Sequence, residues 1–293
     1  MPDLNETSSF TYRFLTTGEF PDVYQAITTA FSDYTVPFAL TEIQLRNHMS
    51  LTAVDLDRSV GCFAEGHLIG ASLNGFGNWL GRPTVYDACT GVLPEFRRKG
   101  VGTDMFQFML PYLKRNGVEQ FLLEVITTNH AAVSLYEGLG FRRSRGLALL
   151  ECDKPKNEIE HFTRDVDVGE LETPDWQLFR EFWDVDPSWQ NLPEAIDRSR
   201  ASKRMIGAYQ DGQCVGYIVF SARFGRISQI AVSKAHRRRG VGSALLSAMH
   251  STIVDEYPTQ VVNVDLASER TLEFFKKFGY YEKIRQHEMM LEL

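Results

Sequence analysis

The sequence has few cysteines, no long hydrophobic run and no excess of positive charge. Its four cysteines lack the Cys-x-x-Cys spacing of zinc sites and redox motifs, so we expect reduced thiols and no structural metal. No apolar run approaches the roughly 20 residues that a membrane-spanning helix needs. The first segment, MPDLNETSSF, lacks the basic and apolar regions of a signal peptide. These absences favour a cytoplasmic protein without a membrane partner.

The charge balance argues against a further class of partner. The formal net charge is −7, with 31 Lys and Arg against 38 Asp and Glu. Proteins that bind nucleic acid without sequence preference use broad basic faces, so we expect no nucleic-acid partner. The basic clusters that the chain does contain are therefore interpreted as local sites for a small ligand.

A basic run followed by two glycines occurs twice, and we call the two copies the first and second cradle. The first cradle consists of Arg97, Arg98, Lys99, Gly100, Val101, Gly102 and Thr103. The second cradle consists of Arg237, Arg238, Arg239, Gly240, Val241, Gly242 and Ser243. Each copy follows a β-branched segment and precedes an apolar pattern with helical period. A strand, a tight turn and a helix are therefore predicted in both halves of the chain.

The length and the repeat together predict two domains. A chain of 293 residues exceeds a comfortable single core, and a polar stretch without apolar periodicity separates the two cradles. We predict an N-terminal domain over 1–152, a linker over 153–162 and a C-terminal domain over 163–293. Strand-like and helix-like segments alternate in each half, which predicts a mixed sheet flanked by helices.

The residue types of the cradle favour an anionic ligand. Glycine tolerates positive φ and a close approach of the backbone to a ligand. Successive N–H groups can then converge at a helix N-terminus, where unpaired donors and the helix dipole favour an anion. The flanking Arg and Lys side chains add mobile positive charge. The cradle therefore predicts a ligand with several phosphates close together.

Two familiar phosphate-binding loops do not fit the cradles. A P-loop requires lysine directly after its second glycine, and neither cradle has one there. A dinucleotide fingerprint requires a third glycine three residues further on, where Met105 and Leu245 stand. The pattern that fits is Arg-x-x-Gly-x-Gly, and through it the sequence resembles the GNAT superfamily of acyl-CoA-dependent N-acetyltransferases. In that superfamily the loop wraps the pyrophosphate of coenzyme A.

A second motif strengthens the resemblance in the first half. Residues 129–141 read NHAAVSLYEGLGF. The positions that match the superfamily pattern are Asn129, Ala132, Leu135, Tyr136, Gly140 and Phe141. The segment 123–125, Leu-Glu-Val, is similar to a strand of the ribosomal-protein alanine acetyltransferases. Residues 1–150 are therefore identified as a member of the superfamily.

The resemblance implies a fold and a cofactor. The fold is α/β, with two tandem GNAT domains, each a mostly antiparallel sheet with a central splayed parallel pair flanked by helices. The acyl-pantetheine arm of acetyl-CoA lies between the splayed strands. In the first half the implied cofactor-binding residues are Val92, Leu93, Pro94, Arg97, Arg98, Lys99, Gly100, Val101, Gly102, Thr103, Asn129, Ala132 and Tyr136. In the second half they are Val232, Arg237, Arg238, Arg239, Gly240, Val241, Gly242 and Ser243.

The resemblance also implies catalytic roles. It places Tyr136 beside the coenzyme A sulfur, where a phenol can give its proton to the leaving thiolate. The backbone N–H of Val92 is the implied donor to the developing oxyanion. Glu124 precedes Tyr136 by twelve residues, which is the spacing of the general base in the alanine acetyltransferases. Asp87 is the other carboxylate expected near the thioester, and proton loss through ordered water to the solvent is a third route.

The second half keeps its cradle but departs at the catalytic positions. Aligned on the glycine-aromatic pair that ends the second motif, it has Phe275 in place of Tyr136 and Asn263 in place of Glu124. Ser268 begins its version of the motif in place of asparagine. We therefore expect turnover in the first half, and a second half that either holds coenzyme A or supports the first.

The main hypothesis is an N-acetyltransferase that moves an acetyl group from acetyl-CoA to the amine of a small molecule. The expected acceptor site is aromatic with one carboxylate, formed by Phe31, Asp33, Tyr34, Phe38 and Trp79. The alternatives are a non-catalytic acyl-CoA-binding sensor or scaffold, acetylation of a peptide N-terminus, and a mycothiol-type substrate. The sequence leaves the oligomeric state open, and the tandem repeat can act as an internal pseudo-dimer.

Overall fold

The computed structural model describes residues 10–33, 40–153, 166–221, 223, 225–253 and 258–293. These residues form two compact units. The first unit comprises Met1–Ser144 and Glu288–Leu293, and the second comprises Arg145–His287. Most of the predicted linker lies outside the described residues, as do Tyr34 and Phe38 of the expected acceptor site.

The compact units do not end at the boundaries that the sequence predicts. Strand β6 (Arg142–Cys152) begins in the first unit and continues into the second. Strand β12 (Tyr281–Glu292) begins in the second unit and ends in the first. The last residues of the chain therefore belong to the first unit, although the sequence assigns them to the C-terminal domain. No local pattern near the linker signals this exchange, because it depends on pairing between distant segments.

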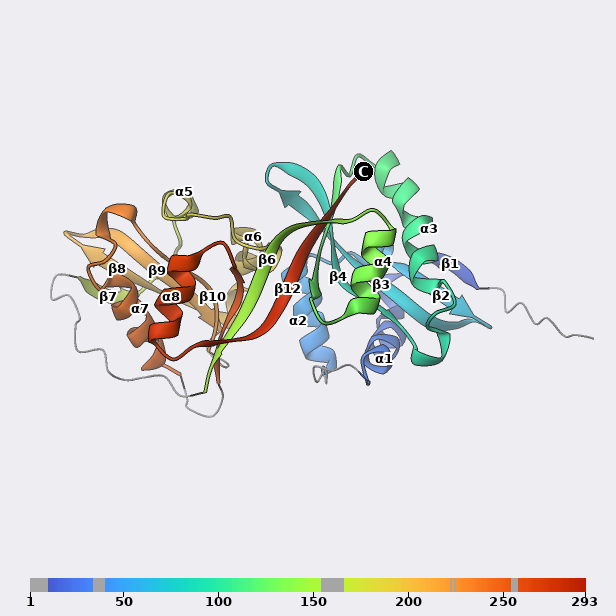
Figure 1. Ribbon diagram of the computed structural model, residues 1–293, viewed down its shortest axis with the longest axis horizontal. Coiled ribbons are helices and arrows are strands. Elements are labelled where there is room, and N and C mark those ends of the chain that lie inside the picture. Colours follow the sequence, from blue (N-terminus) through green and yellow to red (C-terminus); the bar gives the residue numbers. More distant parts are fainter. Residues whose placement is uncertain (1–9, 34–39, 154–165, 222, 224, 254–257) are drawn as a thin grey trace, which may run out of the picture. The chain divides into compact units, whose positions relative to one another are not determined.

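The first unit contains a mixed sheet flanked by helices (Figure 1). Its strand order is β1-β2-β3-β4-β5, followed by the end of β12. The first five strands are β1 (Thr11–Phe14), β2 (Val60–Ala64), β3 (His67–Trp79), β4 (Arg82–Val92) and β5 (Gln120–Ile126). The helices are α1 (Phe20–Ala30), α2 (Glu42–Thr52), α3 (Val101–Arg115) and α4 (His130–Gly138).

Alternate strand residues of the first unit enter two different cores, as the period of a β-strand requires. Phe121, Leu123 and Val125 of β5 pack with the apolar sides of α3 and α4. Ala71 and Leu73 of β3 pack with α1 and α2. Helices α1 and α2 therefore cover one face of this sheet, and α3 and α4 cover the other.

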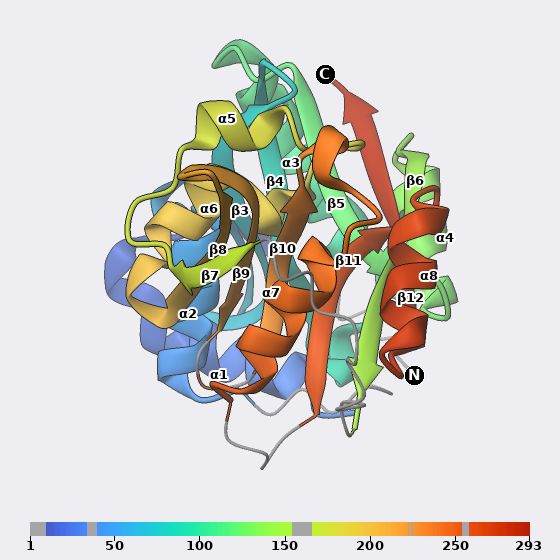
Figure 2. The ribbon, with the colours of Figure 1, turned by 90° about the vertical axis from the view of Figure 1, so that its left-hand side faces the viewer.

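The second unit repeats this arrangement, and Figure 2 shows α7 crossing its strands. Its strand order is β6-β11-β10-β9-β8-β7. The strands after β6 are β7 (Asp167–Glu170), β8 (Lys203–Gln210), β9 (Gln213–Ser221), β10 (Arg226–Val232) and β11 (Thr259–Asp265). The helices are α5 (Trp176–Arg180), α6 (Pro193–Arg198), α7 (Val241–His250) and α8 (Glu269–Lys277).

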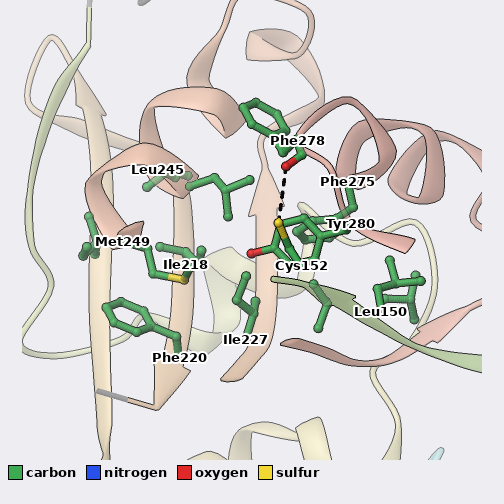
Figure 3. Packing of buried hydrophobic residues seen from close by; sticks show 14 of the residues in the cluster. Leu150, Cys152, Ile218, Phe220, Ile227, Leu245, Met249, Phe275, Phe278 and Tyr280 are labelled. Carbon is green, nitrogen blue, oxygen red and sulfur yellow. Dashed lines mark hydrogen bonds between the residues drawn. The ribbon is translucent and has the colours of Figure 1, made fainter. Parts of the chain in front are cut away.

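Two cores also flank the sheet of the second unit. Ile218, Phe220, Ile227 and Phe275 lie in the larger core with α7 (Figure 3). Tyr217 lies in the smaller core, which α5 and α6 cover. The residues at the centre of the larger core are hydrophobic.

Each unit contains a parallel strand pair whose ladder stops early. Strands β4 and β5 pair from Thr84–Gln120 to Asp87–Leu123, although both strands continue beyond that point. Strands β10 and β11 pair only at Arg226–Gln260 and Ile227–Val261. We call the regions beyond these last pairs the first and second splay. Antiparallel pairing joins β1–β2, β2–β3 and β3–β4 in the first unit, and β6–β11, β10–β9, β9–β8 and β8–β7 in the second. The predicted sheet with a splayed parallel pair is therefore confirmed.

Candidate functional site

Both cradles have the same backbone conformation. In the first cradle Arg98 and Gly100 have φ of 60° and 83°, and in the second Arg238 and Gly240 have φ of 62° and 84°. Positive φ is uncommon for arginine and easy for glycine. Helices α3 and α7 begin at the residue that follows the positive-φ glycine. The repeated sequence therefore folds into a repeated anion-binding geometry.

The helix that leaves each cradle starts without a side-chain cap. Gly100 and Gly240 occupy the N-cap positions of α3 and α7, and glycine has no side-chain oxygen to accept from the first-turn N–H groups. By contrast, Thr41 Oγ1 caps α2 by accepting from the N–H of Gln44 at 3.3 Å. An uncapped helix start offers its donors and its dipole to an anion. Both cradles therefore fit a diphosphate such as that of coenzyme A.

The second glycine of each cradle permits close packing. A Cβ at Gly102 would lie 3.1 Å from a methyl group of Leu135 on α4, and a Cβ at Gly242 would lie 3.3 Å from the ring of Phe274 on α8. These separations are shorter than the optimal carbon–carbon contact of about 3.5 to 4.0 Å. The glycine thus lets α4 or α8 pack against the start of the cradle helix.

The first arginine of the first cradle is bound within its own unit. The guanidinium of Arg97 donates to both carboxylate oxygens of Asp33, at 2.7 and 2.8 Å. It also donates to the carbonyl oxygens of Ala30 and Val92, at 2.6 and 3.2 Å. Arg97 therefore ties the end of α1 to the end of β4.

Arg237 repeats this arrangement in the second unit. It donates to the two carboxylate oxygens of Asp184 at 3.0 and 2.8 Å, and to the carbonyl oxygens of Phe182 and Val232 at 2.7 and 3.0 Å. The expectation of mobile charge is thereby corrected for the side chains of Arg97 and Arg237. Contact with a ligand through their backbone stays a prediction.

The other basic residues of the cradles are exposed and can supply mobile charge. They are Arg98, Lys99, Arg238 and Arg239. The ammonium of Lys99 lies 5.0 Å from the ring centre of Phe96, a weak cation–π contact that leaves its charge at the surface.

The strand that leads into each cradle directs one N–H group into the splay. The N–H of Leu93 donates to the carbonyl of Ile69 on β3 at 2.9 Å. Alternate residues of a strand direct their backbone groups to opposite edges, so Val92 directs its N–H toward the side where the ladder with β5 has ended. In the second unit Ser233 donates to Val215 at 2.8 Å, and Val232 is placed in the same way. This geometry is compatible with the predicted oxyanion donor.

Tyr136 and Asp87 are in direct contact at the first splay. The hydroxyl of Tyr136 donates to Asp87 Oδ2 at 2.9 Å, and the hydroxyl of Thr90 donates to Asp87 Oδ1 at 2.9 Å. Asp87 and Tyr136 are each 7% exposed. Asp87 is the last β4 residue of the parallel ladder, so the phenol lies where β4 and β5 separate. Thr90 is a member of this cluster that the sequence did not reveal.

Burial sets the protonation of this cluster. It raises the pKa of Asp87 from 3.8 to about 6, although the hydrogen bonds from Thr90 and Tyr136 act in the opposite direction. Burial and then the charge of Asp87 raise the pKa of Tyr136 well above its ordinary value. The same two causes raise the pKa of the Cys89 thiol. At neutral pH the phenol and the thiol are therefore protonated, whereas the carboxyl is close to its titration.

Glu124 is the first β5 residue beyond the parallel ladder and is half-buried. Its neighbours Leu123 and Val125 pack in the core under α3 and α4. Because successive strand residues point to opposite faces, Glu124 points to the other face of the sheet. The predicted base and Tyr136 therefore approach the first splay from opposite faces, as an acid and a base acting on two sides of one carbonyl group require.

The second unit has a cavity where the first unit has its catalytic candidates. The cavity has a volume of about 740 Å³, and its lining includes Arg238, Gly240, Val232 and Asn263. It therefore extends from the second cradle into the second splay, and its size is in the range of ligand pockets. Phe275 at the position of tyrosine is fully buried. The cradle residues are kept in this unit, whereas the phenol at the position of Tyr136 is not; the phenol that lines the cavity, Tyr217, donates its hydrogen bond to Gln229.

The position of the predicted base has structural partners in the second unit. Asn263, at the position of the predicted base, donates to Ser188 Oγ at 3.1 Å and accepts from Gln286 Nε2 at 2.8 Å. It has φ of 56° and lies at a register shift of β11. Asparagine tolerates this left-handed conformation better than most residues, so the position is adapted to shape rather than to proton transfer.

Two residues of the expected acceptor site, Asp33 and Trp79, have surroundings other than those predicted. Asp33 is bound to Arg97, so its carboxylate is not placed as a free ligand for an amine, and this corrects the expectation. Trp79 is 3% exposed and thus part of the interior. Asn129, predicted to contact the cofactor, caps α4 by accepting from the N–H of Ala132 at 3.1 Å. Its contact with a ligand stays a prediction.

Among the described residues, no helix combines the length and the apolar character that crossing a bilayer would need.

Comparisons with known families place the chain. Residues 20–141 match the model described as "Acetyltransferase (GNAT) family", and residues 170–289 match the model described as "Acetyltransferase (GNAT) domain". The chain therefore belongs to the GNAT acetyltransferases and carries two domains of this family. The matched ranges include one cradle each, which is the feature that the sequence repeats.

Curated relatives cover parts of the chain. N-alpha-acetyltransferase 30 of Schizosaccharomyces pombe is 34% identical over 101 residues, which are 33% of this chain and 60% of that protein. Mycothiol acetyltransferase of Acidimicrobium ferrooxidans is 27% identical over 190 residues, which are 57% of this chain and 61% of that protein. The chain thus spans about three fifths of the length of these two relatives.

A solved structure matches nearly the whole chain. The tandem GNAT protein from the clavulanic acid biosynthesis pathway has a TM-score of 0.76 at 14% identity, covering 97% of this chain and 98% of that one. A putative acetyltransferase from Pyrococcus horikoshii has a TM-score of 0.69 at 16% identity, covering 100% and 92%. At such identities the likeness shows the tandem fold alone.

Proposed function

We propose that the first unit transfers an acetyl group from acetyl-CoA to the amine of a small molecule. The observation that carries the proposal is the position of Tyr136, a buried phenol at the end of the β4–β5 ladder in the unit that also has the first cradle. When bound, acetyl-CoA supplies the thioester carbonyl and the thiol leaving group. The cradle N–H groups hold the diphosphate, and Val92 N–H donates to the developing oxyanion.

Glu124 takes the proton of the attacking amine in this proposal. A free alkylammonium has a pKa of about 10.4, so only about one molecule in 2,500 is neutral at pH 7. A carboxylate beside the amine can accept its proton during attack, and general-base catalysis typically contributes about 10²- to 10⁴-fold. Glu124 is half-buried on the face opposite Tyr136, which supports this division of roles. Tyr136 then protonates the leaving sulfur.

The second unit is proposed to bind a coenzyme A ester without turning it over. A cavity of about 740 Å³ joins the second cradle to the second splay, which supports binding. Phe275 cannot donate a proton and Asn263 cannot accept one as a base, which argues against transfer. A non-catalytic acyl-CoA sensor is therefore the second candidate function, and it applies to this unit.

The experiment is the release of free thiol from acetyl-CoA in the presence of an amine panel. The panel contains small aromatic and aliphatic amines as the proposed acceptors. It also contains peptides with a free N-terminus and a mycothiol-type amine, since the relatives include N-alpha-acetyltransferase 30, the ribosomal protein bS18 alanine N-acetyltransferase and mycothiol acetyltransferase. We expect thiol release with a small amine, and its loss in Tyr136→Phe. Binding of coenzyme A without thiol release for any amine would favour the sensor.

Stoichiometry tests the second unit separately. Calorimetric titration with coenzyme A is expected to give two sites for the wild type and one for Gly240→Ala, because a side chain at φ of 84° disrupts the second cradle. A single site that Gly240→Ala leaves unchanged would contradict binding in the second unit.

A further inference from the structure

A chain of buried polar groups connects β3, β4 and α4 in the first unit. Beyond the pair of Tyr136 and Asp87, Thr90 Oγ1 lies 3.0 Å from Ser72 Oγ, and Ser72 Oγ lies 3.2 Å from Asn74 Oδ1. Ser72 and Asn74 are fully buried. Thr90 is the donor toward Ser72, and Ser72 is the donor toward Asn74, so the single hydroxyl proton of Thr90 is shared between Ser72 and the Asp87 carboxyl.

The second unit has an apolar residue at every corresponding position. Asp87 and Ile227 are both ten residues before the first arginine of their cradle, and Thr90 and Ile230 are both seven before it. On the neighbouring strand, Asp87 pairs with Asn74 and Thr90 with Ser72, whereas Ile227 pairs with Phe220 and Ile230 with Ile218. The five residues Asn74, Ser72, Asp87, Thr90 and Tyr136 thus correspond to Phe220, Ile218, Ile227, Ile230 and Phe275.

The apolar set forms part of a well-packed core. Ile218, Phe220, Ile227 and Phe275 are fully buried, and Figure 3 shows them in one cluster of hydrophobic side chains. The same architecture is therefore stable without any of the polar groups. A buried carboxyl and its partners cost stability relative to apolar packing. The first unit keeps the whole set where its sister unit has none of it, so the fold itself does not require the set.

We propose that Asp87 is a positioning residue that keeps a second proton behind Tyr136 for the acid step. This inference depends on the proposed acetyl transfer in the first unit. In the active form the neutral Asp87 carboxyl donates its O–H to the oxygen of Tyr136, so the phenol proton is free to point toward the sulfur. Thr90 donates to the other carboxyl oxygen and fixes the orientation of the group.

The step is balanced in atoms and charge. The carbon–sulfur bond breaks, and the phenol proton moves from Tyr136 to the departing thiolate. The carboxyl proton of Asp87 moves to the oxygen of Tyr136, which restores the phenol and leaves a carboxylate. Thr90 stabilises that carboxylate by its hydrogen bond, and solvent returns a proton to Asp87 before the next turnover.

The ionised form of Asp87 opposes the reaction. A charged carboxylate accepts a hydrogen bond from the Tyr136 hydroxyl, as in the contact at 2.9 Å. This bond turns the hydroxyl proton away from the sulfur, and the negative charge raises the pKa of the phenol. Burial is the main cause that brings the pKa of Asp87 up to about 6. The groups that face this carboxyl come from α4, β4 and β3, namely Tyr136, Thr90, Cys89, Ser72 and Asn74. The protonated form is thus accessible near neutral pH.

The first test uses the protein without any ligand. Infrared difference spectra between the wild type and Asp87→Asn are expected to show the carbonyl band of one buried carboxylic acid at pH 5, which disappears as the pH rises toward 8. The reading does not depend on activity. No difference band at pH 5 would mean that Asp87 is ionised throughout, and it would overturn the proposal.

The second test is the pH dependence of kcat in three variants. In the wild type we expect kcat to decline as the pH rises and Asp87 ionises. The amide of Asp87→Asn donates to Tyr136 at every pH, so we expect its kcat to stay within about tenfold of the wild type and to show no such decline. Thr90→Val removes a hydrogen bond that lowers the pKa of Asp87. The pKa of Asp87 therefore rises in this variant, and we expect the decline in kcat to move to higher pH. Glu137→Gln, an exposed carboxylate on the same helix that pairs with Arg143, is the matched control and leaves the profile unchanged.

The outcomes separate this proposal from the function on which it depends. If the wild type releases thiol and Asp87→Asn keeps the wild-type profile, the role of Asp87 is wrong and acetyl transfer stands. If Asp87→Asn loses all activity, as expected for Glu124→Gln, Asp87 is the base and the proposal is overturned. If no amine supports thiol release but the infrared band is present, the proposed function fails while the protonated carboxyl remains.

Discussion

Arg97 and Asp33 form a two-point ion pair, with guanidinium to carboxylate distances of 2.7 and 2.8 Å. Arg237 and Asp184 form its counterpart in the second unit. In both units the arginine also holds the carbonyl of the last strand residue before the cradle. Arg97 and Arg237 are predicted from the sequence to bind a ligand, but their side chains stabilise the strand end that precedes each cradle. We call this arrangement the brace.

The brace leads to a prediction that separates Arg97 from its neighbour. Arg97→Gln loses donors to four acceptor atoms, and we expect a loss of roughly 1 to 3 kcal/mol in the free energy of unfolding. Arg98→Gln leaves stability unchanged and weakens coenzyme A binding, with a smaller dependence of affinity on salt. Thermal unfolding and calorimetric titration at two salt concentrations measure both effects. Equal loss of stability in the two variants would contradict the brace.

The two glycines of the first cradle should respond differently to alanine. Gly100 has φ of 83°, so Gly100→Ala strains the backbone by roughly 1 to 2 kcal/mol and weakens coenzyme A binding strongly. Gly102→Ala places a Cβ 3.1 Å from a methyl group of Leu135, which a small shift of that side chain relieves, so stability falls by less. Denaturant unfolding compares the two. A larger loss for Gly102→Ala would contradict the assigned conformations.

Asp87 should make stability depend on pH in a defined direction. Burial raises its pKa from 3.8 to about 6, so the folded state holds this proton more tightly than the unfolded state. The stability from this proton is complete below pH 3.8 and is lost as the pH rises through 6; it amounts to roughly 3 kcal/mol. Asp87→Asn lacks this loss, so its stability relative to the wild type should increase between pH 4 and pH 8. Parallel curves for the two proteins would contradict a raised pKa.

The fold could be predicted from the sequence where its causes are local. The cradles combine glycine spacing with a strand before and a helix after, and the placement of a helix directly after each cradle follows from that pattern. The crossing of β6 and β12 between the units could not be predicted, because it depends on strand pairing across most of the chain. The length of β3, which continues beyond Leu73 to Trp79 and pairs with β4 there, could not be predicted either, because it also depends on pairing between strands.

In the candidate site, too, features with a local cause could be predicted from the sequence and features that depend on distant residues could not. Tyr136 and Glu124 were predicted from a motif and a spacing, and the structure places both at the first splay. The partner of Arg97 could not be predicted, because Asp33 is 64 residues away. Thr90 was missed for another reason. A bulge between Asp87 and Cys89 changes the alternation of β4, so a threonine three residues from the carboxyl reaches it.

The most direct measurement of the account is thiol release from acetyl-CoA with the amine that the panel identifies, in the wild type, Tyr136→Phe and Gly240→Ala. We predict that Tyr136→Phe loses about 10²- to 10⁴-fold in kcat while it still binds coenzyme A, because the phenol protonates the leaving sulfur. Full activity in Tyr136→Phe, together with loss of activity in Gly240→Ala, would contradict the account and move catalysis to the second unit.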